Sequence, residues 1–172
     1  MPTDQFVNDL IAILGKERVL FEPEHLAVYG YDGTAAISGS TPCVVFPETT
    51  DEVVQIVKYA ASQKRPIVTR GSGTGLSGGS IPVPGSLVVC MSRMNKILEL
   101  DTQNLTILVE PGVTTVTVAD TADSVGLLYP PDPGSMRIST IGGNVAENSG
   151  GLRGLKYGIT RDYVMGMEVV LA

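Results

Sequence analysis

Histidine and tryptophan are nearly missing from this sequence: His25 is the only histidine in 172 residues, and there is no tryptophan. Histidine changes charge near neutral pH and is a frequent metal ligand, so a single histidine cannot build a histidine-based proton relay or metal centre. A lone histidine in a short predicted helix is most often a surface or capping group. We therefore assign His25 no role.

Cysteine is also scarce. Cys43 and Cys90 are the only two cysteines, and each lies inside its own apolar run. That setting favours two small buried hydrophobic side chains over a disulfide or a metal-binding pair. The sequence therefore indicates a reducing compartment.

Basic residues are outnumbered, with 12 lysines and arginines against 18 aspartates and glutamates and a formal net charge of -6. Nucleic-acid binding relies on clustered positive charge, so this balance argues against it, and equally against an acidic partner surface. No apolar run reaches the ~18 residues of a membrane-spanning helix, and Asp4, Asp9 and Lys16 interrupt the N-terminus where a signal peptide would be apolar. We expect a cytoplasmic protein, with peripheral membrane attachment through partner subunits as an alternative.

Glycine, by contrast, is abundant and clustered: five of the 20 glycines fall within residues 70–79 and seven more lie from Gly134 to Gly158. The first cluster, RGSGTGLSGG, directly follows an apolar run. Ordering a glycine costs roughly 0.5 to 1 kcal/mol more than ordering an alanine, so five together indicate a purpose such as close backbone approach to an anion. Successive N–H groups without Cβ atoms can form a concave nest for a phosphate, and Arg70 adds a full charge at its rim. A flexible surface loop is the alternative, but the flanking apolar segments favour a packed loop.

Two well-known glycine signatures do not fit this stretch. Residues 73–78 match the dinucleotide pattern G-x-G-x-x-G, but that pattern must open a helix, and the following IPVPG at residues 81–85 cannot form one. A P-loop needs a lysine after its last glycine, and none occurs between Lys64 and Lys96. What remains is a strand, a phosphate-binding loop and a second strand.

Ahead of this loop, the apolar pattern predicts a βαβ unit. A helix capped by Thr49 and Glu52 runs to about Gln63, between strands at residues 43–46 and 66–69. We expect these two strands to pair in parallel. The glycine loop then lies at the carboxyl end of the second strand, which is the edge where ligands bind in such sheets.

The remaining elements alternate helix and strand, so the fold class is α+β. Helices are predicted from Thr3, as the cap, to Leu14 and at residues 23–29, and another, capped by Thr114 or Thr115, ends at Gly126. Further strands are predicted at residues 87–91, in a hairpin of residues 97–100 and 105–110, and at residues 163–171. Because the chain stops inside that last apolar run, we expect more protein to follow it.

The second glycine cluster runs from Tyr129 to Gly158 and begins with the proline-rich stretch YPPDPGS. An ordinary long loop of this length is uncommon inside a compact domain unless it is functional. Two glycine-rich clusters in one chain indicate that both bind the same extended ligand.

Three motifs together carry a family resemblance: PIVTRGSGTGLSGG at residues 66–79, PDPGS at 131–135 and TIGGNVAENSGG at 140–151. With this order and spacing, the chain resembles FAD-binding proteins of the vanillyl-alcohol-oxidase or p-cresol methylhydroxylase (PCMH) type. Within that family it is similar to the flavin subunit of glycolate oxidase and to D-lactate and related D-2-hydroxyacid dehydrogenases. The resemblance extends from about residue 42 to the last residue.

The resemblance implies a two-lobed PCMH-type α+β fold with FAD between the lobes. Residues 1–40 would form an N-terminal helical segment. Residues 41–100 would form the first FAD-binding lobe, with the parallel βαβ unit and the pyrophosphate loop, and residues 101–172 a truncated, mainly antiparallel second lobe.

It also implies roles for individual residues. In the first motif, those that would hold the pyrophosphate or approach the flavin are Arg70, Gly71, Ser72, Gly73, Thr74, Gly75, Ser77 and Gly78. In the second cluster, those that would line the rest of the cofactor are Pro131, Asp132, Ser135, Thr140, Gly142, Gly143, Ala146, Asn148 and Gly151. Pro131 and Asp132 would approach the isoalloxazine ring, although Asp132, flanked by prolines, is equally well explained as a turn residue with its carboxylate in solvent.

The function that the resemblance implies is oxidation of a small 2-hydroxyacid, such as glycolate or D-lactate, to the 2-oxoacid, with transfer of electrons to flavin. The FAD would be non-covalent, because members with covalent flavin carry a histidine in or near the phosphate loop and this chain has none there. The family's substrate-facing and metal-binding histidines would lie beyond Ala172. The resemblance therefore implies no catalytic residue and no metal site in this chain, and this piece alone would be inactive. The alternatives are a non-catalytic FAD- or nucleotide-binding or assembly module that docks on partner subunits, and a nicotinamide-dependent reductase of cell-wall precursors.

Overall fold

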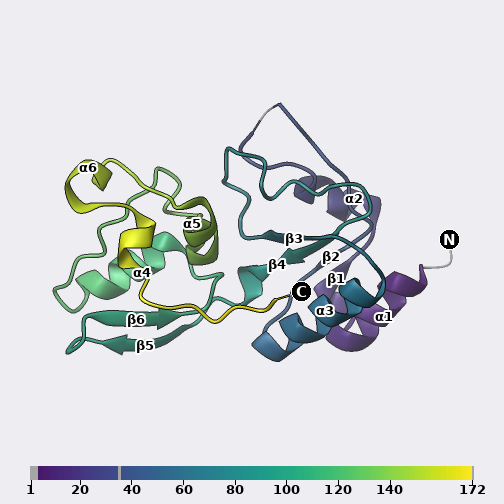
Figure 1. Cartoon of the computed structure of the whole chain (residues 1–172), viewed down its shortest axis with the longest axis horizontal. Coiled ribbons are helices and arrows are strands. Elements are labelled where there is room, and N and C mark those ends of the chain that lie inside the picture. The colour runs from purple at the N-terminus through teal and green to yellow at the C-terminus, as the bar shows by residue number, and fades with distance from the viewer. Residues whose placement is uncertain (1–3, 35, 172) are drawn as a thin grey trace. The chain divides into compact units, whose positions relative to one another are not determined.

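The computed structural model describes residues 4–34 and 36–171, which form two compact units (Figure 1). The first unit holds the described residues up to Arg93 together with those from Val169 onward, and the second unit is Met94–Glu168. Both units mix helices and strands, as predicted. No helix in the described ranges is both long and apolar enough to cross a membrane.

A four-stranded sheet organises the first unit. Its strands are β1 (Val19–Leu20), β2 (Val44–Val45), β3 (Ile67–Arg70) and β4 (Leu87–Cys90), in the spatial order β1-β2-β4-β3. The β1 strand is antiparallel to β2, whereas β2, β4 and β3 are parallel to one another. The buried strand predicted at residues 43–46 and the strand predicted at 87–91 are therefore confirmed in shorter form.

The predicted pairing of β2 with β3 is wrong, because β4 lies between them. All four residues of β4 are buried, which is the pattern of a central strand covered on both faces. The β3 strand starts directly after Pro66, which lacks an N–H donor, and it carries an exposed Thr69. Those features suit an edge strand, in agreement with the observed order.

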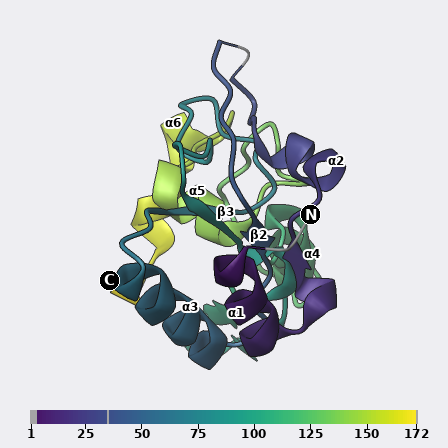
Figure 2. The same ribbon diagram turned by 90° about the vertical axis from the view of Figure 1, so that its right-hand side faces the viewer.

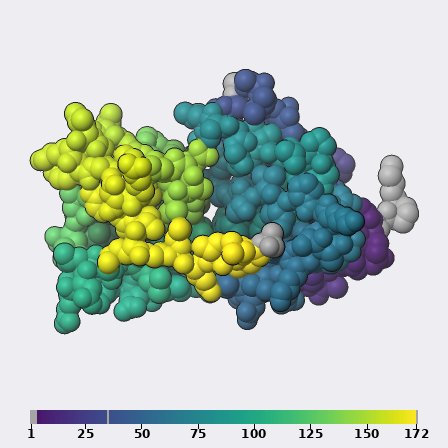
Figure 3. Space-filling view, in the orientation of Figure 1, coloured from purple at the N-terminus to yellow at the C-terminus, as the bar shows by residue number. Residues whose placement is uncertain are grey.

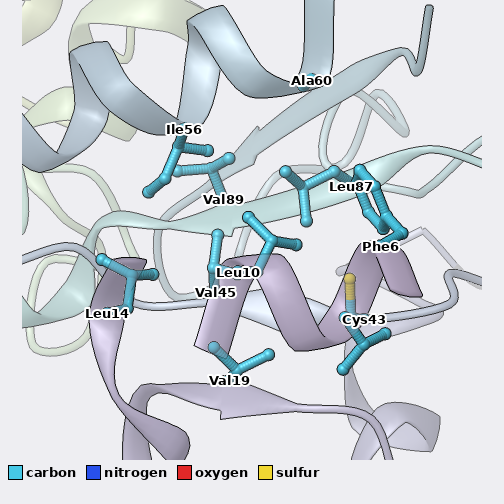
Figure 4. Packing of buried hydrophobic residues seen from close by; sticks show 11 residues of the cluster. Phe6, Leu10, Leu14, Val19, Cys43, Val45, Ile56, Ala60, Leu87 and Val89 are labelled. Atoms are coloured by element: carbon cyan, nitrogen blue, oxygen red, sulfur yellow. The ribbon is translucent and has the colours of Figure 1, made fainter. Parts of the chain in front are cut away.

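Two helices cover this sheet and lie side by side, α1 (Gln5–Leu14) and α3 (Thr50–Ser62) (Figure 2). Apolar residues of α1 at helical spacing meet Ile56 and Ala60 of α3 and the inward side chains of the strands (Figure 4). Burial of Cys43 in this core raises the pKa of its thiol to about 12, so Cys43 is an inert hydrophobic side chain, as predicted. The buried cluster comprises Phe6, Val7, Leu10, Leu14, Val19, Cys43, Val45, Ile56, Ala60, Leu87 and Val89.

Helix ends agree in part with the sequence. Asp4 caps α1 by accepting the N–H of Phe6 at 3.3 Å, while the predicted cap, Thr3, lies outside the described residues. Gly15, with φ of 89°, ends α1 as predicted. The predicted helix at residues 23–29 is found as α2 (Pro23–Leu26) followed by a 3₁₀ turn, Ala27–Tyr29.

The N-terminus of α3 is tied to the rest of the unit by Glu52. Thr49 caps the helix by accepting the Glu52 N–H, as predicted, and the Glu52 carboxylate accepts two bonds from Arg18 at 2.7 and 2.8 Å. Burial alone would raise the pKa of Glu52, but hydrogen bonds from the Glu48 N–H and the Arg18 guanidinium outweigh it and lower that pKa below 4.5. The ionised carboxylate therefore stabilises the folded unit.

The second unit begins with a hairpin of β5 (Ile97–Asp101) and β6 (Thr106–Val109), as predicted. Asp101 closes the turn by accepting the N–H groups of Gln103 and Asn104. Helix α4 (Thr115–Asp123) follows, capped by Thr114 and stopped before Gly126, which has φ of +76°. Both its start and its end agree with the sequence.

The chain after α4 differs from the prediction. Helices α5 (Ile141–Glu147) and α6 (Gly154–Tyr157) lie inside the second glycine cluster, where no helix was predicted. The strand predicted at residues 163–171 is wrong: residues 160–163 form a 3₁₀ turn, and no strand in the described part of the chain pairs with residues 164–171. This last segment lies on the surface, with Met165 and Leu171 more than four-fifths exposed (Figure 3). An apolar run becomes a strand only when it has a pairing partner, and the run itself carries no information about that partner.

We predict that Glu52→Gln lowers the free energy of unfolding by about 1 to 2 kcal/mol at neutral pH, because a charged acceptor of several hydrogen bonds is lost. Since the folded pKa of Glu52 is below 4.5, its contribution is present above that pH and is lost as the pH falls through the lowered value. The difference between the variant and the parent should therefore shrink in acid. Urea denaturation across pH measures it.

Asp51→Asn is the matched control, because Asp51 is an exposed carboxylate in the same helical turn and forms no ion pair with any residue that the structure describes. A loss of stability in Glu52→Gln no larger than in Asp51→Asn, or one independent of pH, contradicts the assignment.

Candidate functional site

The glycine loop lies at the carboxyl edge of the first unit's sheet, as predicted. Strand β3 ends at Arg70, which is in register with Cys90 at the end of the parallel strand β4. The loop of residues 71–79 therefore starts beside the chain that leaves β4 at residues 91–93. At this edge the hydrogen bonds between strands end, so backbone groups become available to a ligand.

Two positions in the loop require glycine. Gly73 and Gly78 have φ of +73° and +81°, in the left-handed region that L-residues rarely adopt. A Cβ on Gly73 would overlap the guanidinium of Arg70, and a Cβ on Gly78 would lie 2.7 Å from Cδ1 of Ile37. The bend at Gly73 and its close packing on Arg70 thus both depend on the missing Cβ.

Arg70 lies beneath the loop rather than at its rim. Its side chain is buried, and its Nη1 and Nη2 donate to the carbonyl oxygens of Tyr31 at 2.7 Å and Val28 at 3.5 Å. The guanidinium also lies 5.5 Å from the centre of the Tyr29 ring. The predicted position of Arg70 at the rim is therefore wrong. Its side chain is held by two carbonyl groups about 40 positions away in the sequence, which local sequence cannot reveal. Whether its charge acts on a bound phosphate stays a prediction.

The loop keeps hydrogen-bond donors available. Among the hydrogen bonds of the described residues, none is donated by the backbone N–H groups of residues 71–75. A run of such donors over a buried guanidinium is the chemistry that an anionic diphosphate needs. This observation fits the predicted phosphate site.

A pocket of about 370 Å³ opens beside the loop, and Tyr29, Tyr31 and Ser92 are among the residues that line it. Burial raises the pKa of the Tyr29 phenol, and the neighbouring Cys90 adds to the shift, so this phenol is neutral. Tyr29, Tyr31 and Ser92 were not predicted as lining residues. Ser92 could have been predicted as a lining residue, because it closely follows a buried strand whose carboxyl end lies at the same sheet edge. The full lining is Val28, Tyr29, Tyr31, Arg70, Gly71, Ser72, Gly73, Cys90 and Ser92.

In the second unit, Asp132 is neither in solvent nor free. Its side chain is 14% exposed, and Oδ1 accepts the Arg153 N–H at 3.0 Å while Oδ2 lies 3.5 Å from the Arg153 guanidinium. Gly151 packs so closely on Asp132 that a Cβ there would overlap its carboxylate and carbonyl. The solvent-exposed turn considered for Asp132 is therefore wrong, because the turn of residues 151–153 covers the carboxylate. A contact with flavin stays a prediction.

A buried polar network holds the start of α5. The Asn144 amide donates to Thr115 Oγ1 at 2.6 Å, and Thr115 Oγ1 lies 2.9 Å from Ser139 Oγ. Gly142 packs on Pro111, where a Cβ would lie 2.8 Å from the proline ring, and its N–H donates to the Pro111 carbonyl. The network joins residues 24 and 29 positions apart, so the local sequence contains no signal for it.

The structure gathers the remaining predicted residues of this cluster around α5. Thr140 is the buried N-terminal residue before the helix, and Gly143 lies in its first turn. Ala146 is exposed on the helix, while Asn148 ends it in a left-handed conformation and accepts the Arg161 N–H. Pro131 is buried, and the Ser135 carbonyl closes a turn with Ile138 and Ser139. The first-motif residues thus lie together in one unit and the second-cluster residues in the other.

The family model described as "FAD binding domain" matches residues 41–172. This chain belongs to that FAD-binding family. The match covers both glycine clusters, the sheet edge and α5, so the predicted family and the predicted cofactor, FAD, are confirmed.

Curated relatives of the chain are, by their names, oxidases and dehydrogenases. It is 50% identical over all 172 residues to the glycolate oxidase subunit GlcD of Bacillus subtilis, of which it covers 37%. It is 41% identical over 159 residues to a D-lactate dehydrogenase of Anaerostipes hadrus and 35% identical over 170 residues to a D-2-hydroxyglutarate dehydrogenase of Stutzerimonas stutzeri. These matches cover 92% and 99% of the chain and 33% and 37% of those relatives. The chain thus spans about a third of the length of the curated relatives it matches.

Solved structures confirm the predicted α+β fold of the PCMH type. An alkyldihydroxyacetonephosphate synthase superposes with a TM-score of 0.82 at 24% identity, over 92% of this chain and 31% of that one. A p-cresol methylhydroxylase with bound substrate superposes with a TM-score of 0.74 at 26% identity, over 84% of this chain and 29% of that one. The FAD-binding domain is accordingly one of the kind found in oxidoreductases.

We predict that Gly73→Ala lowers both FAD retention and stability. The left-handed φ alone costs an alanine about 1 to 2 kcal/mol, and the new methyl group also displaces the Arg70 guanidinium. The flavin-to-protein absorbance ratio and thermal denaturation measure the two effects.

Gly85→Ala separates the two causes. Gly85 lies in the same unit with φ of +78°, but a Cβ there meets nothing within 4 Å. It should lose stability through φ alone and keep its flavin, whereas equal flavin retention by both variants contradicts a role of the Gly73 bend.

Proposed function

We propose that this chain is the FAD-binding part of a flavoenzyme that oxidises a small 2-hydroxyacid, of the glycolate or D-lactate class, to the 2-oxoacid. The observation that carries this proposal is the 50% identity over the whole chain with a glycolate oxidase subunit. The D-lactate and D-2-hydroxyglutarate dehydrogenases among the relatives act, by their names, on the same class of substrate.

In this proposal, the first unit binds the phosphates of FAD. The N–H groups of residues 71–75 donate to the diphosphate, and the buried Arg70 supplies positive charge beneath them. Ser77 and Gly78 lie further along the same loop and approach the flavin. The pocket beside the loop, lined by Tyr29 and Tyr31, takes part of the cofactor that adjoins the diphosphate.

The second unit supplies the groups nearer to the ring system. The proposed contacts there are Pro131, Asp132, Ser135, Thr140, Gly142, Gly143, Ala146, Asn148 and Gly151. Asp132 also positions Gly151 in this proposal, because the Asp132 carboxylate fixes the turn of residues 151–153. The network of Asn144, Thr115 and Ser139 holds the segment that contains Gly142 and Gly143 in place.

FAD, when bound, supplies the electron acceptor for the reaction. Oxidation of a 2-hydroxyacid also requires a base for the hydroxyl proton. His25 is a poor choice of base, since its side chain is 61% exposed and its Nδ1 lies 3.5 Å from Oε2 of the exposed Glu22 carboxylate. We therefore place the catalytic base and any metal ligands outside the present sequence, in the part of the relatives that this chain does not span.

We propose that the FAD is held non-covalently, since residues 70–79 contain no histidine. We also propose that the protein works with partner subunits, because one relative is named as a subunit of glycolate oxidase. A non-catalytic FAD-binding or assembly module is the competing function.

The test uses the full-length protein purified with FAD. We expect its flavin spectrum to be released into the supernatant by acid, and to bleach under anaerobic conditions when glycolate, D-lactate or D-2-hydroxyglutarate is added. L-lactate serves as the control of opposite configuration.

Flavin that remains in the acid precipitate contradicts non-covalent binding. Flavin that is bound but is bleached by no short 2-hydroxyacid contradicts the enzymatic proposal and favours the module.

A further inference from the structure

A segment ahead of the matched family region contacts the glycine loop directly. It comprises residues 30–34 and 36–39, here termed the brace, and the family match begins only at residue 41. The brace is irregular, with neither helix nor strand in its described residues. Hydrogen bonds hold it to the glycine loop.

Two hydrogen bonds join the brace to the middle of the loop. The Gly33 N–H donates to the Gly75 carbonyl at 2.8 Å, and the Thr34 hydroxyl donates to the Leu76 carbonyl at 2.6 Å. The brace also approaches the loop at Gly33, where a Cβ would lie 2.8 Å from the Gly75 carbonyl oxygen. Consecutive carbonyl groups of the loop are thus both turned toward the brace.

Asp32 fixes the turn that presents these donors. Its buried carboxylate accepts the Thr34 N–H at 2.8 Å, and its other oxygen lies 3.5 Å from Ser80 Oγ, beyond the far end of the loop. At the near end, the Tyr31 carbonyl accepts the bond from Arg70. The brace therefore contacts residues before, within and after the glycine run.

These contacts determine the direction of neighbouring N–H groups. In a planar trans peptide, the N–H points opposite to the C=O of the same unit. When the Gly75 and Leu76 carbonyl groups face the brace, the N–H groups of Leu76 and Ser77 face away from it. The brace thus sets the orientation of donors in a loop whose glycines would otherwise allow many conformations.

We propose that Asp32, Gly33 and Thr34 are positioning residues that hold the glycine loop in the conformation that accepts the phosphates of FAD. This inference rests on the proposed binding of FAD at the loop. Ordering the loop before the ligand arrives removes part of the entropic cost of binding. The unit that binds the cofactor therefore extends about ten residues ahead of the matched family region.

The test replaces Thr34 in the protein with its FAD. Thr34→Val keeps the shape of the side chain but cannot donate to the Leu76 carbonyl, so we expect FAD to bind about fivefold more weakly, the effect of one lost hydrogen bond. Thr34→Ser keeps the hydroxyl and should restore most of the affinity. Thr121→Val is the matched control, since the Thr121 hydroxyl donates to the Thr117 carbonyl within α4 of the other unit.

Amide hydrogen exchange of the flavin-free protein gives a second readout that needs no cofactor. In Thr34→Val, the Gly33 amide, which donates to the Gly75 carbonyl, should exchange several-fold faster than in the parent and in Thr34→Ser, with the amides of the β2 and β4 strands unchanged. An increase spread evenly over the whole unit would indicate general destabilisation and would overturn the proposal.

The two proposals fail differently. If the parent binds FAD and Thr34→Val binds it equally well, the brace has no positioning role although the FAD site stands. If the parent binds no FAD, the proposed function fails, and the exchange of the Gly33 amide still decides whether the brace holds the loop.

Discussion

The contact between Gly73 and the Arg70 guanidinium is the constraint on which the candidate site depends. The loop can turn in its left-handed conformation only because residue 73 has no Cβ, and the space that a Cβ would need is filled by the guanidinium. The guanidinium is held there by the Tyr31 and Val28 carbonyl groups. A buried charge and a run of backbone donors are thereby placed together at one sheet edge, which is the requirement for binding a diphosphate.

The remainder of the first unit keeps that edge fixed. The β4 strand is buried along its whole length between β2 and β3, and α1 and α3 close the core against it. The end of β3, where Arg70 lies, is therefore set by apolar packing. In the second unit, polar contacts take over this role: Asp132 holds the turn of residues 151–153, and the Asn144 network holds the start of α5.

Local signals made part of this structure predictable. The excess of glycine behind an apolar run located the loop, and caps such as Thr49 and Thr114 located helix starts, because these features act over a few neighbouring residues. Sheet order, the position of the Arg70 side chain and the environment of Asp132 were not predictable, since each depends on partners far away in the sequence. Helix α5 was missed because Gly142 and Gly143 disfavour a helix locally, and the contact with Pro111 compensates only in the folded unit.

The candidate site requires that the backbone N–H groups of residues 71–75 hold the phosphates of FAD. The most direct measurement is the amide NMR spectrum of the ¹⁵N-labelled protein during titration with FAD, compared with titration by riboflavin, which lacks phosphate. We expect FAD to cause large shifts of the amide signals of residues 71–75, and we expect riboflavin not to reproduce them. Binding of FAD that leaves these five amides unshifted while others move would contradict it.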